Sequence, residues 1–326
     1  MSHAFCAMMS RESGEDLIGT APTFSTYVLI ECPHPWAERE FESKAVPSNL
    51  KAFVEHVRQA KLSIRFLLFK GEPSEQTRVM IFRKSEGLMA GYRKRQFQLD
   101  SIKQVAPLLE SYWSETGLEI DTHDSPDSDI FVCTHGSHDK CCAKFGYPFY
   151  REASKLATSS NVWQVSHIGG HRFAPTIVTF PDGRYYGRLD AESFSAIINC
   201  SGEICHLERV YRGWGVLPKP VQVIERAIAL ERGWEWVGYQ IDYQILLADS
   251  ESMQIELRGE KEGERSLIYT ATIGVSEIKD VIGSCGNEAA MKVVKFSIEQ
   301  IQQVTQSQSW TIPRRTISQS NLAISS

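Results

Sequence analysis

The 326-residue sequence lacks a membrane-spanning run, since no apolar stretch approaches the roughly 20 residues that cross a bilayer. Its start, M-S-H-A-F-C-A-M-M-S-R, lacks both a basic region and an uninterrupted apolar core, so no secretory signal is visible. A net charge of −5 disfavours general nucleic-acid binding, which needs a clustered basic surface. We therefore expect a soluble, cytoplasmic protein with neither membrane nor nucleic-acid partners.

Several enzyme signatures are also missing. A thiol–disulfide oxidoreductase would need a C-x-x-C at the start of a helix, and the chain has none. No glycine-rich phosphate-binding loop is present, and no placed pair of carboxylates supports glycoside hydrolysis. A nucleophile and base made of Cys142 with His135 or His138 is conceivable but is the weaker interpretation of these residues.

What the chain does contain is an order of elements that occurs twice. Short apolar runs predict strands, and apolar residues at helical spacing predict helices. In the first unit, residues 23–120, the expected elements are a strand at 27–30, a helix at 49–57, a strand at 62–69, a hairpin of 77–82 and 87–92, and a helix at 101–113. After an acidic linker at 121–129 the same order returns in residues 128–215: a strand at 129–133, a helix at 147–157, a strand at 161–166, a hairpin of 176–180 and 184–189, and a helix at 191–200. This βαβ–ββα order predicts two tandem thioredoxin-like units.

The remaining segments have other patterns. Residues 219–305 predict a smaller α+β domain, with a helix at 221–234, three strands that alternate in polarity, and a second helix at 288–304. Residues 1–22 are expected to be irregular, and the Ser- and Gln-rich residues 306–326 to form a flexible tail. The predicted fold class is therefore mixed α/β.

The eight cysteines are poor candidates for a disulfide framework in a chain of this size without a secretory signal. Cys32, Cys200 and Cys285 are interpreted as small buried side chains. Cys133 and Cys142 differ, because they flank the junction between a buried strand and a helix, where the helix start favours a thiolate.

Two histidines provide the matching pair of ligands. His167 and His171 follow the next predicted strand in S-H-I-G-G-H-R-F-A, and the glycines between them permit close approach to an inorganic centre. Two thiols and two imidazoles are the ligand set of structural zinc sites and of Rieske-type [2Fe–2S] clusters. Eight residues lie between Cys133 and Cys142, more than the two to four between the cysteines of zinc fingers. This spacing favours the larger [2Fe–2S] cluster over a zinc ion.

The segments C-T-H-G-S-H-D-K-C-C-A, S-H-I-G-G-H-R-F-A and P-D-G-R-Y-Y-G-R-L resemble the sucrase/ferredoxin-like family, a branch of the thioredoxin-like [2Fe–2S] ferredoxins. The resemblance covers roughly residues 15–215. It implies that Cys133 and Cys142 bind one iron of a [2Fe–2S] cluster, and that His167 and His171 bind the other. Cys141 is the alternative to Cys142 as the second cysteine ligand, and the pattern of the related proteins favours Cys142.

The resemblance also implies a soluble electron carrier. Neutral imidazole ligands would raise the potential of the cluster, and their second ring nitrogens would couple reduction to protonation. We expect redox partner proteins, a carrier rather than a catalyst, and no sucrase activity. A non-enzymatic Cys₂His₂ zinc-binding interaction module is the alternative. Arg172 is expected to raise the potential, to mark the docking face of a partner, or to form a surface salt bridge.

Overall fold

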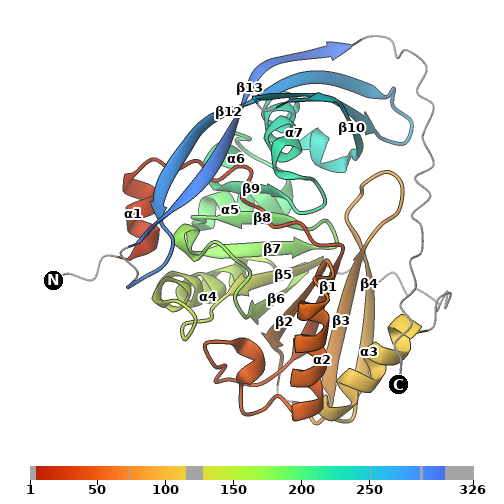
Figure 1. Cartoon of the computed structure of the whole chain (residues 1–326), viewed down its shortest axis with the longest axis vertical. Helices are drawn as coiled ribbons and strands as arrows, with labels where there is room; N and C mark the ends of the chain where they lie inside the picture. Colours follow the sequence, from red (N-terminus) through yellow and green to blue (C-terminus); the bar gives the residue numbers. More distant parts are fainter. Residues whose placement is uncertain (1–4, 73, 115–127, 250, 287–288, 305–326) are drawn as a thin grey trace.

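A computed structural model of the chain describes residues 5–72, 74–114, 128–249, 251–286 and 289–304. The protein has the mixed α/β fold that the sequence predicted, and its described residues form one sheet of nine strands and another of four. The nine-stranded sheet has the order β4-β3-β1-β2-β6-β5-β7-β8-β9 (Figure 1). Among the described residues, no helix is both long and apolar enough to cross a membrane.

The first half of the large sheet follows the predicted order. Strands β1 and β2 are parallel and joined through a helix, and β3 pairs antiparallel with both β1 and β4. Alternate residues of β1 enter two different cores: Val28 and Ile30 face helices α2 and α3, whereas Tyr27 and Leu29 join the central core. This two-sided burial explains the continuous apolar run. The elements are β1 (Thr26–Glu31), α2 (Ser48–Gln59), β2 (Ile64–Lys70), β3 (Thr77–Lys84), β4 (Tyr92–Leu99) and α3 (Val105–Ser114).

The second half repeats this strand order and adds one strand at its edge. Strand β5 is parallel to β6 and antiparallel to β7, β8 follows β7, and β9 extends the sheet. The elements are β5 (Ser128–Cys133), α4 (Tyr147–Leu156), β6 (Ser160–Val165), β7 (Thr176–Phe180), β8 (Arg184–Gly187), α5 (Ala191–Asn199), α6 (His206–Val210) and β9 (Tyr211–Trp214).

The two halves join edge to edge through β2 and β6, which the sequence did not predict. The antiparallel pairing is short, with Phe69 opposite Val165 and Lys70 opposite Gln164. Ser166 extends it, because its backbone N–H donates to the carbonyl of Leu68 (2.7 Å) and its hydroxyl accepts from the Leu68 N–H (3.0 Å). The residue after Ser166 is the first predicted histidine ligand, so this junction lies beside the candidate site.

The C-terminal residues form a helix and a second sheet that pack against the same central core. Helix α7 contributes Ile224 and Ile228 to that core, and its buried Glu225 pairs with Arg184 of β8 at 2.7 Å. Figure 1 shows the long β12–β13 hairpin extending from this domain to the N-terminal helix α1. The elements are α1 (Cys6–Glu12), α7 (Lys219–Arg232), β10 (Gln240–Ala248), β11 (Ser252–Glu260), β12 (Leu267–Ile282) and β13 (Ala290–Val304).

The helix predicted at 288–304 is wrong, because residues 290–304 form β13, paired with β12. The spacing of Met291, Val294, Ile298 and Ile301 imitates a helical face. However, one of the two register shifts in the β12–β13 ladder falls in β13, at Glu299, and interrupts the strand alternation between Ile298 and Ile301. Met291 and Val294, expected to face inward, are 46% and 47% exposed.

Two further boundaries differ from the prediction. The second strand of the first hairpin is not at 87–92 but is β4, because Gly87 and Gly91 adopt positive φ angles of 81° and 119° and turn the chain. The segment 1–22, expected to be irregular, contains helix α1, which packs on the turn His171–Phe173 that includes the second predicted histidine ligand. Most of the acidic linker, and all of the tail at 306–326, lie outside the described residues.

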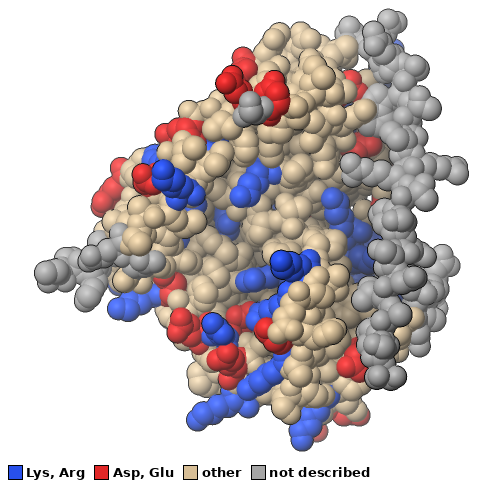
Figure 2. Space-filling view, in the orientation of Figure 1, with Lys and Arg blue, Asp and Glu red and all other residues tan. Residues whose placement is uncertain are grey.

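Both signs of charge occur on the surface. Figure 2 shows Lys and Arg side chains beside Asp and Glu side chains over the lower part of the visible face. Such interspersed charge is typical of globular surfaces. The described residues of the visible face therefore form no large patch of a single charge that would indicate a binding site.

Candidate metal centre

The two predicted cysteines lie close together because a glycine permits it. Cys133 ends β5, and Cys142 begins a π-helical turn, Cys142–Gly146, that continues into α4. A Cβ at Gly146 would lie 2.0 Å from the carbonyl oxygen of Cys133, so only glycine allows the helix start to rest on the end of the strand. Both thiols are buried.

His167 comes from the loop after β6, the parallel neighbour of β5. Its Nδ1 lies 3.9 Å from the Sγ of Cys133 and 3.8 Å from the Sγ of Cys142. The ligand atoms of these three residues all lie within 4.8 Å of one another. Two soft sulfur donors and one nitrogen donor are therefore close enough to surround one metal ion, although Cys133 and His167 are 34 residues apart in the chain.

His171 lies next to this group but is turned partly away. Its ring centroid is 5.1 Å from that of His167, while its Nδ1 is 3.2 Å from a carboxylate oxygen of Asp139 and 3.4 Å from the Sγ of Cys6. Nε2 is the nitrogen of His171 that these two contacts leave available. The structure thus brings three predicted ligands together directly and places the fourth beside them.

Two arginines hold the loop that bears both histidines. Arg65, on β2 of the first half, donates to the carbonyl of His167 at 2.6 Å, and Arg212, on β9, donates to the carbonyl of Gly169 at 2.9 Å. Gly170 has φ 77°, and a Cβ there would lie 2.6 Å from the guanidinium of Arg212. Gly170 is thus needed both for its positive φ angle and for the space that the Arg212 side chain occupies.

The first half of the sheet supports the site although it has no ligand of its own. The Nε2 of His135 lies 2.7 Å from the carbonyl of Ala37, so Nε2 carries the proton and Nδ1 is free to accept from the N–H of His167 (3.2 Å). Ser137 donates to the carbonyl of Trp36 at 2.7 Å. The loop around residue 36 therefore positions both ligand-bearing loops.

The surroundings favour the neutral form of both predicted histidine ligands. Burial lowers the pKa of His167 far below its usual range, and the neighbouring His138, His171 and Arg65 act in the same direction. Burial also lowers the pKa of His171, although Asp139 partly opposes this. Neutral imidazole is the form that binds a metal.

The two thiols of the site differ in acidity. A hydrogen bond from Cys142 lowers the pKa of Cys133, and backbone N–H groups of His135 and Ile168 lower it further despite burial. The pKa of Cys142 is raised by the same hydrogen bond and by burial. Cys133 is therefore the member of the pair that loses its proton more readily, and the thiolate is the metal-binding form.

Cys141, the competitor of Cys142, lies elsewhere. Its Sγ is 3.4 Å from that of Cys6 and 3.2 Å from that of Cys285, so it belongs to another group of thiols. Its pKa is lowered to about 7, chiefly by the hydrogen bond from Cys6. Cys285, interpreted from sequence as a plain buried side chain, is half-buried and part of this group.

Sequence reasoning missed Asp139 at the site and considered His138 only as a possible base for Cys142. Asp139 was not singled out, yet it accepts from the N–H groups of Cys141 (2.8 Å) and Cys285 (2.9 Å) and contacts His171. His138 stacks on His167 with ring centroids 4.0 Å apart. Their position inside the motif T-H-G-S-H-D-K was the available signal.

Arg172, adjacent to His171, is neither a surface residue nor unpaired. Its guanidinium donates to both carboxylate oxygens of the buried Glu15 at 3.0–3.2 Å. The expected surface salt bridge is thus a buried ion pair, which fastens the segment after α1 to the loop that carries His171.

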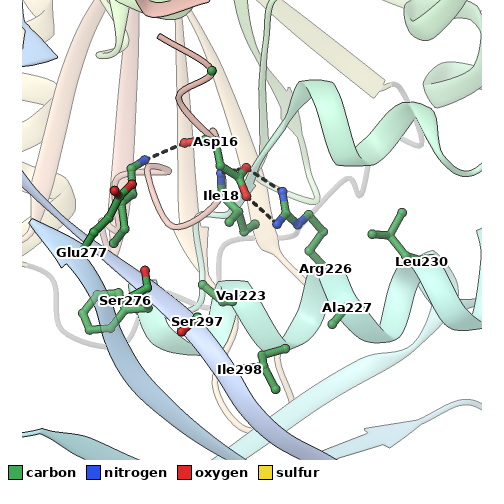
Figure 3. A pocket seen from close by; sticks show the side chains of 13 residues that line it. Asp16, Ile18, Val223, Arg226, Ala227, Leu230, Ser276, Glu277, Ser297 and Ile298 are labelled. Atoms are coloured by element: carbon green, nitrogen blue, oxygen red, sulfur yellow. Dashed lines mark hydrogen bonds and ion pairs between the residues drawn. The ribbon is translucent and has the colours of Figure 1, made fainter. Parts of the chain in front are cut away.

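A cavity of about 390 Å³ lies away from the thiols, between α7 and the β12–β13 hairpin (Figure 3). Three of its charged residues are held together: Arg226 binds both carboxylate oxygens of Asp16 at 2.7 Å, and Lys295 donates to the backbone carbonyl of Asp16 at 2.6 Å. None of the Cys and His groups described above lines it, so we assign it no part in the metal centre.

The protein is thus a mixed α/β protein in which Cys and His side chains from two loops lie close together. Residues 17–213, more than half of the chain, match the family model described as sucrase/ferredoxin-like, and the chain belongs to this family. The expected family is therefore confirmed.

Two curated relatives share part of the sequence, and both are named altered inheritance of mitochondria protein 32. The chain is 30% identical to the one from Meyerozyma guilliermondii over 94 residues, which cover 26% of this chain and 33% of that protein. It is 27% identical to the one from Debaryomyces hansenii over 113 residues, covering 31% and 41%. The matches span less than half the length of either relative.

Among solved structures, the chain is similar to the thioredoxin-like [2Fe–2S] ferredoxin from Aquifex aeolicus, with 20% identity and a TM-score of 0.23 over 28% of this chain and 96% of that one. A Cys55Ser variant of the same ferredoxin matches at 19% identity and a TM-score of 0.19, over 22% and 82%.

Proposed function

We propose that the protein is an electron carrier that binds a [2Fe–2S] cluster through Cys133, Cys142, His167 and His171. The observation that carries this proposal is the convergence of two sulfurs and the Nδ1 of His167 within 4.8 Å, with His171 beside them. Two thiolates and two neutral imidazoles form a ligand set used by [2Fe–2S] clusters. Membership of a ferredoxin-like family supports the same cofactor.

The bound cluster would supply one-electron redox chemistry at a potential raised by its nitrogen ligands. The residues of the chain have separate tasks in this function. Cys133 and Cys142 would provide the negative charge, while His167 would bind through Nδ1, which faces the sulfurs. The carboxylate of Asp139 would orient His171 through Nδ1, as carboxylates orient many metal-bound histidines. Since imidazole nitrogens outside the coordination can take up protons, we expect the potential to depend on pH.

One geometric observation favours the alternative, a zinc-binding interaction module. The distances of 3.8 and 3.9 Å from His167 to both sulfurs are close to the ~3.6 Å that tetrahedral geometry gives for ligands of a single zinc ion. A zinc ion would need only small movements of these three residues. A bound [2Fe–2S] cluster and a bound zinc ion are distinguished by the metal and sulfide content of the protein and by its visible absorption.

The deciding experiment measures iron, acid-labile sulfide and zinc on anaerobically prepared protein, together with its visible absorption. Two irons and two sulfides per chain, both lost in Cys142→Ser, would support the proposal. A colourless protein whose zinc content falls in Cys142→Ser would refute it in favour of the zinc module. Cys205→Ser is the matched control, since that thiol is exposed.

An electron carrier requires a donor and an acceptor, so redox partner proteins are part of the proposal. No step of the function needs a substrate to be bound and converted, and we propose a carrier rather than a catalyst. The names of the curated relatives refer to mitochondria, whereas a cytoplasmic location was expected from the sequence and stays a prediction.

A further inference from the structure

A second group of thiols lies next to the first but uses none of its cysteines. It joins three segments that are far apart in the chain: Cys6 from α1, Cys141 from the loop before α4, and Cys285 from the turn between β12 and β13. The three Sγ–Sγ distances are 3.4 Å (6–141), 3.2 Å (141–285) and 3.6 Å (6–285). The sulfurs therefore form a nearly equilateral triangle.

These distances fit a shared metal ion better than a disulfide. A disulfide needs two sulfurs at about 2.05 Å and leaves a third thiol without a partner. Thiolates bound tetrahedrally to one zinc ion, with Zn–S bonds of about 2.3 Å, are separated by about 3.8 Å. The triangle would have to expand by only a few tenths of an ångström on each side to hold such an ion.

The surroundings of the triangle have the features of a built site. Asp139 belongs to the same group, whose ligand atoms all lie within 4.8 Å of one another, and it provides a fourth donor. Two backbone N–H groups donate to the sulfurs, from Ala7 to Cys141 (3.4 Å) and from Cys6 to Cys285 (3.5 Å), which stabilises thiolates. Cys6 and Cys141 are fully buried, and Asp139 is 5% exposed.

We propose that Cys6, Cys141, Cys285 and Asp139 bind a structural zinc ion. Three thiolates and a carboxylate complete a closed tetrahedral set, with no position left for substrate, which is typical of structural rather than catalytic zinc. The ion would fasten α1 and the β12–β13 hairpin to the loop that carries Cys142.

This role agrees with the polar contacts nearby. Lys279 of β12 donates to the carbonyl of Ser13 at 2.9 Å, and Lys295 of β13 donates to that of Asp16 at 2.6 Å. The hairpin is thus already held along the segment that follows α1, while the zinc site would hold its turn (Figure 1). Asp139 also contacts His171, so the same carboxylate would connect the zinc site to the redox site.

The test compares metal content in the full-length protein and in variants, all prepared anaerobically without chelator. The expected result is one zinc per chain in the wild type and a loss of that zinc in both Cys6→Ser and Cys285→Ser, with iron and sulfide unchanged. Cys205→Ser, at an exposed thiol, should keep both metals.

Failure of this proposal can be distinguished from failure of the proposed function. If the first site held zinc rather than iron, the wild type would contain two zinc ions and Cys285→Ser one. Absence of zinc from reduced wild-type protein, after Zn²⁺ alone has been added and the excess removed, would overturn the second site. So would a disulfide between any two of the three cysteines, detected as a mass 2 Da lower in the protein as prepared anaerobically.

A second measurement covers the case in which the variants do not fold. Chelator treatment of the wild type should remove zinc and speed hydrogen exchange of Cys6–Glu12 and of the turn around residue 285. Unchanged exchange in both segments after complete removal of zinc would contradict the structural role.

Discussion

The guanidinium of Arg65 donates to the carbonyl oxygen of His167 at 2.6 Å, across the junction between the two halves of the large sheet. The half that has no proposed ligand therefore holds the loop that carries two of them. Together with the bond from His167 N–H to His135, this contact fixes the backbone on both sides of one proposed ligand. The site is thus a property of the joined sheet and not of its second half alone.

Replacement of Arg65 by Met should loosen this loop. A half-buried carbonyl would lose a charged donor, which costs about 1–3 kcal/mol in the free energy of unfolding. Denaturant unfolding of both proteins measures the loss. Arg83→Met is the control, since that side chain is 65% exposed, and an equal loss in both variants would contradict the role of Arg65.

The two glycines between the histidines should respond differently to alanine. Both have positive φ angles, 91° at Gly169 and 77° at Gly170, so either substitution strains the backbone by about 1–2 kcal/mol. Only at Gly170 would the new Cβ also meet a side chain, the guanidinium of Arg212, whereas Gly169 faces open space. We expect Gly170→Ala to lose bound metal and Gly169→Ala to keep most of it, as measured by iron per chain; the reverse order would refute the packing argument.

Exchange of a histidine ligand for cysteine should change the redox properties rather than abolish the centre. His167→Cys and His171→Cys should retain a cluster with a lower potential, moving toward the roughly −400 mV of all-cysteine plant-type clusters, and with weaker pH dependence. Potentiometric titration at several pH values measures both effects. His138→Ala is the control, since His138 stacks on His167 but is not a proposed ligand; an unchanged potential in both cysteine variants would remove the ligand assignment.

The buried ion pair of Glu15 with Arg172 should make stability depend on pH in the acidic range. Burial by itself would raise the pKa of Glu15, but the hydrogen bonds and charge of Arg172, the hydrogen bond from Ser10 and the charge of Lys295 together outweigh burial. They hold the pKa below its ordinary value of 4.5. Because the folded-state pKa is the lower one, the stabilisation is complete above about pH 4.5 and is lost as the pH falls through the folded-state value.

Glu15→Gln tests this pair directly. It should cost about 3–5 kcal/mol of unfolding free energy at pH 7, because the buried charge of Arg172 would lose its carboxylate. It should also flatten the fall in stability below pH 4.5. Glu86→Gln, at a side chain that is 92% exposed, should do neither, and an acid profile in Glu15→Gln identical to that of the wild type would argue against the assignment.

Local patterns predicted the large sheet well. The runs at 27–30, 62–69 and 129–133 became β1, β2 and β5, because strands buried on both faces are apolar throughout. Strand β4 was misplaced because its sequence, Y-R-K-R-Q-F-Q-L, is mostly polar, and its buried Lys94 is tolerated only through its ion pair with Asp129 at 2.5 Å. A partner 35 residues away cannot be inferred from the strand itself.

The sequence by itself singled out the four residues that we propose as ligands of the first site, since the C-x₈-C and H-x₃-H spacings stand at predicted strand ends. Only the tertiary structure decided that Cys141 leaves this site and meets Cys6 and Cys285, and that β2 and β6 join the two halves. The physical reason is that periodicity and propensity act between neighbours in the chain. The contacts of Cys141 with Cys6 and Cys285 join residues 135 and 144 positions apart. No periodic sequence pattern indicates such contacts, because their geometry depends on how the folded elements pack.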